Sequence, residues 1–197
     1  MIREFHLADW LTLANAFCGV SAIFAVMTYL QSGEVSHLHF ACGLIPCALL
    51  FDVLDGRVAR WRQESSAMGR ELDSLSDVIS FGVAPAAIAY GFGMQGLYDR
   101  VVLLYFVMCG VSRLARYNVT AEKLSEGSDQ VRYFEGTPIP TSLVLVLVLA
   151  VAIWRGAMGE QMWFGAIAIG KFHLHPLVLM FAASGSLMIS RYRVPKF

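Results

Sequence analysis

Charged residues are scarce in this sequence. Only 15% of its 197 residues are Asp, Glu, Lys or Arg, against about a quarter in an ordinary soluble domain. Apolar residues make up 57% and occur in long runs. The shortage of charge argues against a soluble globular protein and favours a membrane protein. The 15 basic and 15 acidic residues cancel, so net charge identifies no partner, and we expect no nucleic acid among the partners.

Cysteine is also scarce, and the positions of the cysteines argue against both a disulfide-stabilised protein and a zinc-binding protein. The four cysteines lie in apolar runs and include no Cys-x-x-Cys pair. We therefore expect small buried apolar side chains rather than a disulfide framework or a zinc site. Internal repeats and low-complexity tracts are absent as well, so we expect a single membrane-embedded domain over residues 1–197.

Six apolar stretches have the length and composition of membrane-spanning helices, although the fifth is short. A spanning helix needs about 20 mainly apolar residues. The sequence therefore predicts an all-α integral membrane protein with six transmembrane helices. Their expected ranges are Trp10–Leu30, Leu38–Trp61, Leu72–Phe92, Leu97–Val119, Ile139–Trp154 and Phe172–Ile189. The stretch Met1–Asp9 mixes charged and apolar residues, which suits either a short interfacial helix over residues 1–9 or a frayed tail.

The distribution of basic residues predicts how the helices are oriented. Twelve of the 15 Lys and Arg residues fall near the termini, near the ends of the second and fourth expected helices, or in the loops that follow these helices. Only Arg100, Arg155 and Lys171 fall on the other side. Because cytoplasmic loops carry the excess of Lys and Arg, we expect both termini and these two loops in the cytosol.

Four aspartates lie toward the cytosolic ends of the second and third expected helices. Asp52 and Asp55 are three residues apart and Asp73 and Asp77 are four apart, so each pair occupies one face of its helix. The pairs Asp55–Asp73 and Asp52–Asp77 are both centred near residue 64, in the turn. An antiparallel hairpin therefore brings the four carboxylates together. Ionisable side chains at membrane depth are costly and indicate a functional site.

Clustered carboxylates need a cationic partner, because like charges repel. Two divalent cations balance four negative charges, and ligand sets made only of oxygen favour Mg²⁺ or Mn²⁺. Such a pair of ions suits phosphoryl chemistry, in which it holds the attacking and the leaving oxygens. Gly56, Ala59 and Gly69 leave room for a ligand nearby, and Arg60 can bind phosphate. Solvated helix ends with salt bridges are the structural alternative, which leaves the depth of Asp52 and Asp77 unexplained.

At these residues the sequence resembles the CDP-alcohol phosphotransferase family, whose pattern is D-x2-D-G-x2-A-R-x8-G-x3-D-x3-D. All eight fixed positions are filled, by Asp52, Asp55, Gly56, Ala59, Arg60, Gly69, Asp73 and Asp77. The resemblance implies that family's six-helix fold and transfer of a phosphatidyl-type group from a CDP-linked lipid to an alcohol, with release of CMP. It implies two metals held by the four aspartates, with Asp77 as general base. It also implies a CDP-lipid site bordered by Gly56, Ala59, Arg60 and Gly69, and a homodimer in the membrane.

Further segments resemble the phosphatidylserine synthase branch of this family. They are Thr12–Gly19, Asp73–Ala86, Ser112–Asn118 and Phe134–Pro140. This resemblance implies CDP-diacylglycerol and L-serine as substrates. Serine carries a carboxylate, for which a bidentate Arg is a natural receptor, so Arg113 and Arg116 are the candidates. The same arginines suit the donor pyrophosphate or a phosphorylated acceptor equally well.

Two other functions stay open on the sequence alone. One is the same chemistry with another acceptor, such as glycerol 3-phosphate or inositol phosphate. The other is a divalent-cation transporter lined by the aspartates, which leaves the glycines and Arg60 of the pattern unexplained. The polar residue Asn15, in the first expected helix, suits either a position facing the cavity or a hydrogen bond to a neighbouring helix.

Overall fold

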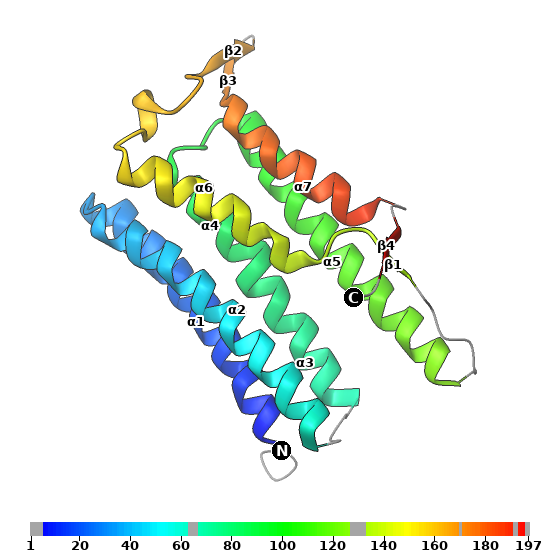
Figure 1. Cartoon of the computed structure of the whole chain (residues 1–197). Coiled ribbons are helices and arrows are strands. Elements are labelled where there is room, and N and C mark those ends of the chain that lie inside the picture. The colour runs from blue at the N-terminus through cyan, green and yellow to red at the C-terminus, as the bar shows by residue number, and fades with distance from the viewer. Residues whose placement is uncertain (1–5, 63–66, 127–132, 170, 191–192, 196–197) are drawn as a thin grey trace.

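The computed structural model describes residues 6–62, 67–126, 133–169, 171–190 and 193–195. Most of this chain is helical, and the long helices run side by side (Figure 1). The α-helices are α1 (Leu7–Ser32), α2 (Ser36–Arg62), α3 (Ala67–Asp77), α4 (Ala84–Phe92), α5 (Leu97–Glu126), α6 (Leu143–Trp154) and α7 (Leu179–Ile189). A π-helix, η2 (Val78–Val83), joins α3 to α4, and the 3₁₀ turns are η3 (Ile139–Ser142), η4 (Gly159–Gln161) and η5 (Pro176–Val178).

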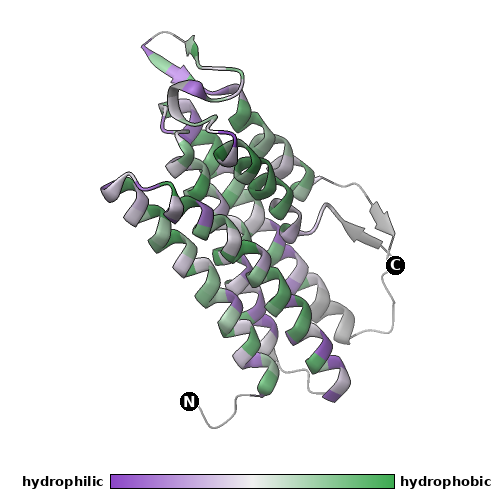
Figure 2. Ribbon diagram, turned by 60° about the vertical axis from the view of Figure 1, so that its left-hand side comes forward, coloured by the Kyte–Doolittle hydropathy of each residue, from purple (hydrophilic) through white to green (hydrophobic). Residues whose placement is uncertain are grey.

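The apolar helices agree with an integral membrane protein. Three helical stretches are long and apolar enough to cross a membrane, namely Leu7–Ser32, Ser36–Arg62 and Met68–Phe92. Two shorter apolar helices cover Ile139–Trp154 and Pro176–Ile189, and α5 is 30 residues long. Hydrophobic residues cover the helices over most of their length (Figure 2). The number of crossings and the location of the termini stay predictions.

Small side chains allow α1 and α2 to pack closely. The buried face of α1 includes Cys18, Ala22 and Ala25, and that of α2 includes Ala41, Cys42 and Ala48. Gly33 ends α1 with a left-handed φ of 74°, and its N–H donates to the Tyr29 carbonyl at 2.8 Å. Membrane helices commonly associate through small residues, because close backbone approach increases van der Waals contact. Large apolar side chains such as Phe17 and Phe24 lie instead on the exposed face.

The third expected helix is interrupted by the π-helix η2. Its last hydrogen bond runs from the Ala84 N–H to the Ile79 carbonyl, five residues back. Pro85 follows immediately and has no N–H to donate. The wider turn lies directly after Asp77, and π-turns of this kind are frequent at functional sites.

The fold is mostly helical, as expected, and two short strand pairs add to the helices. Strand β1 (Tyr133–Glu135) pairs antiparallel with β4 (Arg193–Pro195), and β2 (Ile167–Ile169) pairs antiparallel with β3 (Phe172–Leu174). The sixth expected helix was therefore placed too early, because its residues 172–174 form β3. Its helical part begins with Pro176, and His175 before it is extended, as residues that precede proline usually are.

Other boundaries also differ from the sequence prediction, and α3 begins at Ala67 rather than Leu72. Helix α5 continues to Glu126, beyond the expected end at Val119. Helix α1 already begins at Leu7, so the end of the expected interfacial segment over residues 1–9 forms its first turn. Residues 1–5 of that segment and the turn at residues 63–66 lie outside the described residues.

Candidate active site

Three of the four motif aspartates meet between α2 and α3. Each of Asp52, Asp55 and Asp73 offers a carboxylate oxygen, and these oxygens lie within 4.8 Å of one another. Asp55 is only 5% exposed, while Asp52 and Asp73 are half-buried. The antiparallel hairpin of α2 and α3 thus brings together carboxylates from two helices (Figure 1).

Asp77 lies beside this group and completes the set of four carboxylates. It is the last residue of α3 and is 7% exposed. Its carboxylate interacts directly with Asp52 and electrostatically with Asp55 and Asp73. The four donors are all carboxylate oxygens, and this donor chemistry suits hard divalent cations.

Helix α1 contributes two polar side chains that the sequence analysis did not assign to the site. The Thr12 hydroxyl donates to Asp55 Oδ2 at 2.7 Å. The Asn15 amide Nδ2 donates to Asp77 Oδ1 at 3.3 Å. Asn15 therefore bonds across to a neighbouring helix, at the aspartate cluster. Their three-residue spacing in an apolar run was the signal that could have identified this pair, since such spacing puts both on one face.

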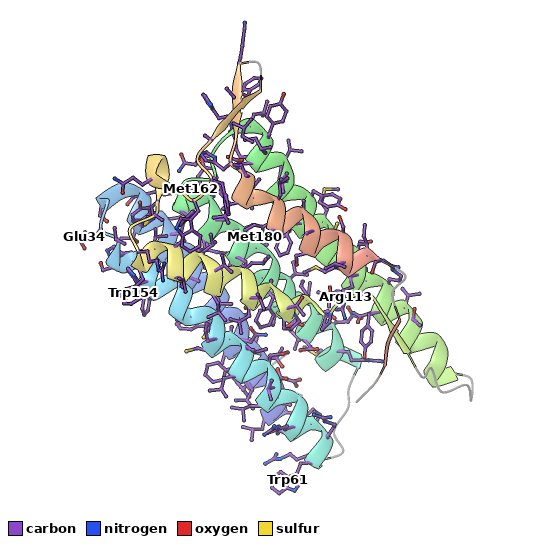
Figure 3. The ribbon with its side chains drawn as sticks, turned by 45° about the horizontal axis from the view of Figure 1, so that its top comes forward. Glu34, Trp61, Arg113, Trp154, Met162 and Met180 are labelled. Carbon is purple, nitrogen blue, oxygen red and sulfur yellow. The ribbon has the colours of Figure 1, made fainter. Side chains whose placement is uncertain are left out.

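Of the two candidate acceptor arginines, only Arg113 is directed toward the cluster. It extends from α5 (Figure 3), is half-buried, and interacts electrostatically with Asp77. Its Nε atom is buried and has no hydrogen-bond partner. Arg116, one turn further along α5, is exposed. The geometry thus separates two arginines that the sequence left equivalent.

The residues expected around the CDP-lipid lie in the last turns of α2 and at the start of α3. A Cβ atom added at Gly56 would meet nothing within 4 Å, so open space lies beside that backbone. Arg60 is exposed, and its Nε donates to the Gly56 carbonyl at 2.9 Å. Ala59 and Gly69 are half-buried. The backbone of Gly56, which follows Asp55 in the chain, is therefore accessible to a ligand.

The π-helix is attached to α1 beside Asp77. Ser80 Oγ donates to the Asn15 carbonyl at 2.9 Å. Gly19 permits this approach, because a Cβ atom there would lie 2.5 Å from Ser80 Oγ and 2.8 Å from Ser80 Cα. Asn15 is consequently held to the same segment through both its backbone and its side chain.

A cavity of about 700 Å³ lies away from the aspartates and is lined by residues that include Tyr29, Gly93 and His173. His175, also in its wall, has its Nδ1 atom 2.6 Å from Asp99 Oδ2. The backbone N–H of His175 donates to Asp99 Oδ1 at 2.8 Å. These contacts attach the chain after β3 to the start of α5, which is a structural role.

The apolar helical bundle and its buried carboxylate cluster define an integral membrane protein with a site suited to divalent cations. A family model described as CDP-alcohol phosphatidyltransferase matches residues 5–183. The chain belongs to this family and is a transferase.

Similar proteins come from yeast, bacteria and archaea. Over its whole length the chain is 42% identical to a CDP-diacylglycerol–serine O-phosphatidyltransferase of Saccharomyces cerevisiae, covering 72% of that protein. It is 36% identical to the Helicobacter pylori protein of the same name, over 94% of this chain and 70% of the relative. An archaetidylserine synthase of Methanothermobacter thermautotrophicus is 38% identical over 74% of this chain and 60% of the relative.

Proposed function

We propose that this protein transfers the phosphatidyl group of CDP-diacylglycerol to the hydroxyl of L-serine, producing phosphatidylserine and CMP. The observation that carries the proposal is the 42% identity, over the entire chain, to a yeast protein named for this reaction. The bacterial relative of the same name and the complete eight-position aspartate pattern support it.

The reaction is a single displacement at phosphorus. The serine oxygen attacks the phosphorus that carries the diacylglycerol, and the bond from this phosphorus to the bridging oxygen breaks. That oxygen leaves with CMP, and the hydroxyl proton passes to Asp77, the general base. A base must reach the proton it removes directly or through one water. The location of Asp77 beside the other three carboxylates and Arg113 supports this role.

Asp52, Asp55, Asp73 and Asp77 are the proposed ligands of two divalent cations, Mg²⁺ or Mn²⁺. When bound, such ions neutralise the pyrophosphate and stabilise charge on the attacking and leaving oxygens. Gly56, Ala59, Arg60 and Gly69 would border the CDP-lipid. The open space beside Gly56 supports this assignment.

Arg113 is the proposed receptor for the serine carboxylate. A planar guanidinium matches a carboxylate with two parallel hydrogen bonds. Its electrostatic interaction with Asp77 supports a receptor near the proposed base, whereas Arg116 is exposed. The remaining proposals come from the basic residues and the family resemblance: six crossings in a single domain, a site that opens to the cytosol, and a homodimer.

Acceptor preference tests this function. Purified protein in detergent receives radiolabelled CDP-diacylglycerol, Mn²⁺ or Mg²⁺, and serine, glycerol 3-phosphate or inositol phosphate in parallel. We expect CMP release and labelled phosphatidylserine only in the reaction that contains serine as the acceptor. CMP release that is independent of serine, or faster transfer to glycerol 3-phosphate, would contradict the proposal. Metal flux into liposomes without CDP-lipid would instead indicate the cation transporter.

A further inference from the structure

Unsatisfied polar atoms gather around Asp77. Within the described residues, three buried side-chain atoms have no hydrogen-bond partner: Asn15 Oδ1, Arg113 Nε and Ser142 Oγ. The first two belong to side chains that contact or interact with Asp77. Buried polar atoms are nearly always hydrogen-bonded, so such exceptions call for a partner that arrives later, such as a substrate.

The orientation of Asn15 leaves a hydrogen-bond acceptor free. Asn15 is 0% exposed, and its Nδ2 donates to Asp77 Oδ1. An ionised carboxylate only accepts hydrogen bonds, so the amide must turn its nitrogen toward Asp77 and its oxygen away. The Ser80 hydroxyl holds the Asn15 backbone in place. Asn15 Oδ1 is therefore a fixed, neutral acceptor beside the proposed base.

The polar groups of the acceptor complement the unpaired atoms Asn15 Oδ1 and Arg113 Nε. An α-amino acid with a hydroxyl side chain has three polar groups: a hydroxyl, a carboxylate and an ammonium. Asp77 is assigned to the hydroxyl and Arg113 to the carboxylate, which leaves the ammonium. An ammonium is a pure donor and needs an oxygen acceptor. A neutral amide oxygen provides one without adding a carboxylate that would compete for cations.

We propose that Asn15 binds the ammonium group of the acceptor amino acid through Oδ1, while its Nδ2 holds Asp77 in position. This inference rests on the proposed transfer to serine. The acceptor then contacts Asn15 on α1, Asp77 on α3 and Arg113 on α5. Because these are three separate contacts, they select the chirality of the acceptor as well as its charge. Acceptors without an ammonium, such as glycerol 3-phosphate, leave Asn15 Oδ1 unpaired and are rejected.

Acceptor analogues separate this role from a merely structural one. 3-Hydroxypropanoate lacks the ammonium of serine, and serinamide lacks its carboxylate. The full-length protein in detergent is assayed with serine and both analogues, as wild type, Asn15→Ala and Asn15→Leu. Thr28→Ala is the matched control, because Thr28 lies on the same helix, is exposed, and its hydroxyl donates to the Phe24 carbonyl of that helix.

Wild type should prefer serine over 3-hydroxypropanoate in kcat/KM, and Asn15→Ala should reduce that preference by about 10- to 100-fold, the effect of one hydrogen bond to a charged group. The preference for serine over serinamide and the KM for CDP-diacylglycerol should change little. Thr28→Ala should match wild type throughout. An unchanged serine to 3-hydroxypropanoate ratio in Asn15→Ala or Asn15→Leu would overturn the proposal, even if kcat falls.

Wild type alone provides a second test that does not depend on the variants folding. Equal use of serine and 3-hydroxypropanoate by wild type would overturn the role of Asn15, while the proposed transfer to serine would stand. No transfer to serine at all would instead contradict the proposed function.

Discussion

Asp77 lies between a neutral amide from α1 and a guanidinium from α5. The Asn15 amide donates to one of its oxygens at 3.3 Å, and Arg113 interacts with it electrostatically. Three other carboxylates surround it. A carboxylate with this mixture of neighbours can accept a proton from an incoming hydroxyl at a fixed position, which a general base must do.

Removing the negative charge of this residue tests its role directly. Asp77→Asn keeps the size of the side chain but cannot take a proton, so turnover should fall by about 10²- to 10⁴-fold. Binding of CDP-diacylglycerol should largely remain, because Gly56, Ala59 and Gly69 are unchanged. CMP release and equilibrium binding of labelled CDP-lipid are the measurements. Turnover near the wild-type rate would contradict the assignment of Asp77 as base.

A substitution at Gly56 separates an effect on ligand binding from an effect on the stability of the fold. Gly56→Ala adds a methyl group to open space, so the thermal midpoint should hold or rise slightly, since alanine favours helix over glycine. The KM for CDP-diacylglycerol should nevertheless rise, because the methyl group occupies ligand space. Gly43→Ala on the same helix also meets nothing within 4 Å and is the matched control, with KM expected unchanged. Equal KM values for the two variants would argue against a CDP-lipid site at Gly56.

Among the elements, α1 and the π-helix η2 (Val78–Val83) contact each other beside the site. Gly19 and Ser80 form their closest approach, and Ser80 bonds to the Asn15 carbonyl. Asn15 belongs to α1, Asp77 directly precedes η2, and a hydrogen bond joins their side chains. The separation of α1 from η2 therefore sets the distance from Asn15 to Asp77.

Gly19→Ala should separate these elements. The new Cβ would lie 2.8 Å from Ser80 Cα, and overpacking of this kind costs about 1–3 kcal/mol. We expect a lower thermal midpoint in detergent and a lower kcat, because the Asn15–Asp77 hydrogen bond lengthens. Both quantities come from one preparation, with Gly43→Ala again as control. A variant as stable and active as wild type would show that this contact does not position the site.

The sequence predicted the hairpin arrangement of the aspartates because both helices are regular there. Asp52, Asp55 and Asp73 meet as their spacing about the turn required. The bond from Asn15 to Asp77 joins residues 62 positions apart, and helical periodicity carries no information about such pairs. The π-helix was missed because its residues are as apolar as those of a regular span, although Pro85 indicated a missing donor. Strand β3 was missed for a similar reason, since Phe172–Leu174 continues the apolar pattern.

At the scale of the whole molecule, the two ends of the bundle differ in chemistry. The aspartate cluster lies toward the end at which α2 finishes, and Trp61 is exposed there (Figure 3). Glu34 and Trp154 lie toward the other end (Figure 3). Exposed tryptophans at both ends suit the two membrane–water interfaces. The basic residues predict that the aspartate end faces the cytosol.

Cysteine labelling in intact cells tests this orientation. The four native cysteines are first replaced by alanine, and Glu34→Cys and Arg62→Cys are then made separately at exposed positions. A membrane-impermeant maleimide should label Glu34→Cys in intact cells and Arg62→Cys only after lysis. The reverse pattern would place the aspartate site outside the cytosol.

We propose that carboxylates from two neighbouring helices bind paired hard cations. Titration of the purified protein with Mn²⁺, followed by electron paramagnetic resonance in the presence of CDP-diacylglycerol, measures this directly. We predict two ions per chain, coupled at a separation of about 3.5–4 Å, and loss of the coupling in Asp52→Asn and Asp73→Asn. Full binding of coupled Mn²⁺ by those variants, or a single isolated ion in wild type, would contradict a two-metal site formed by these carboxylates.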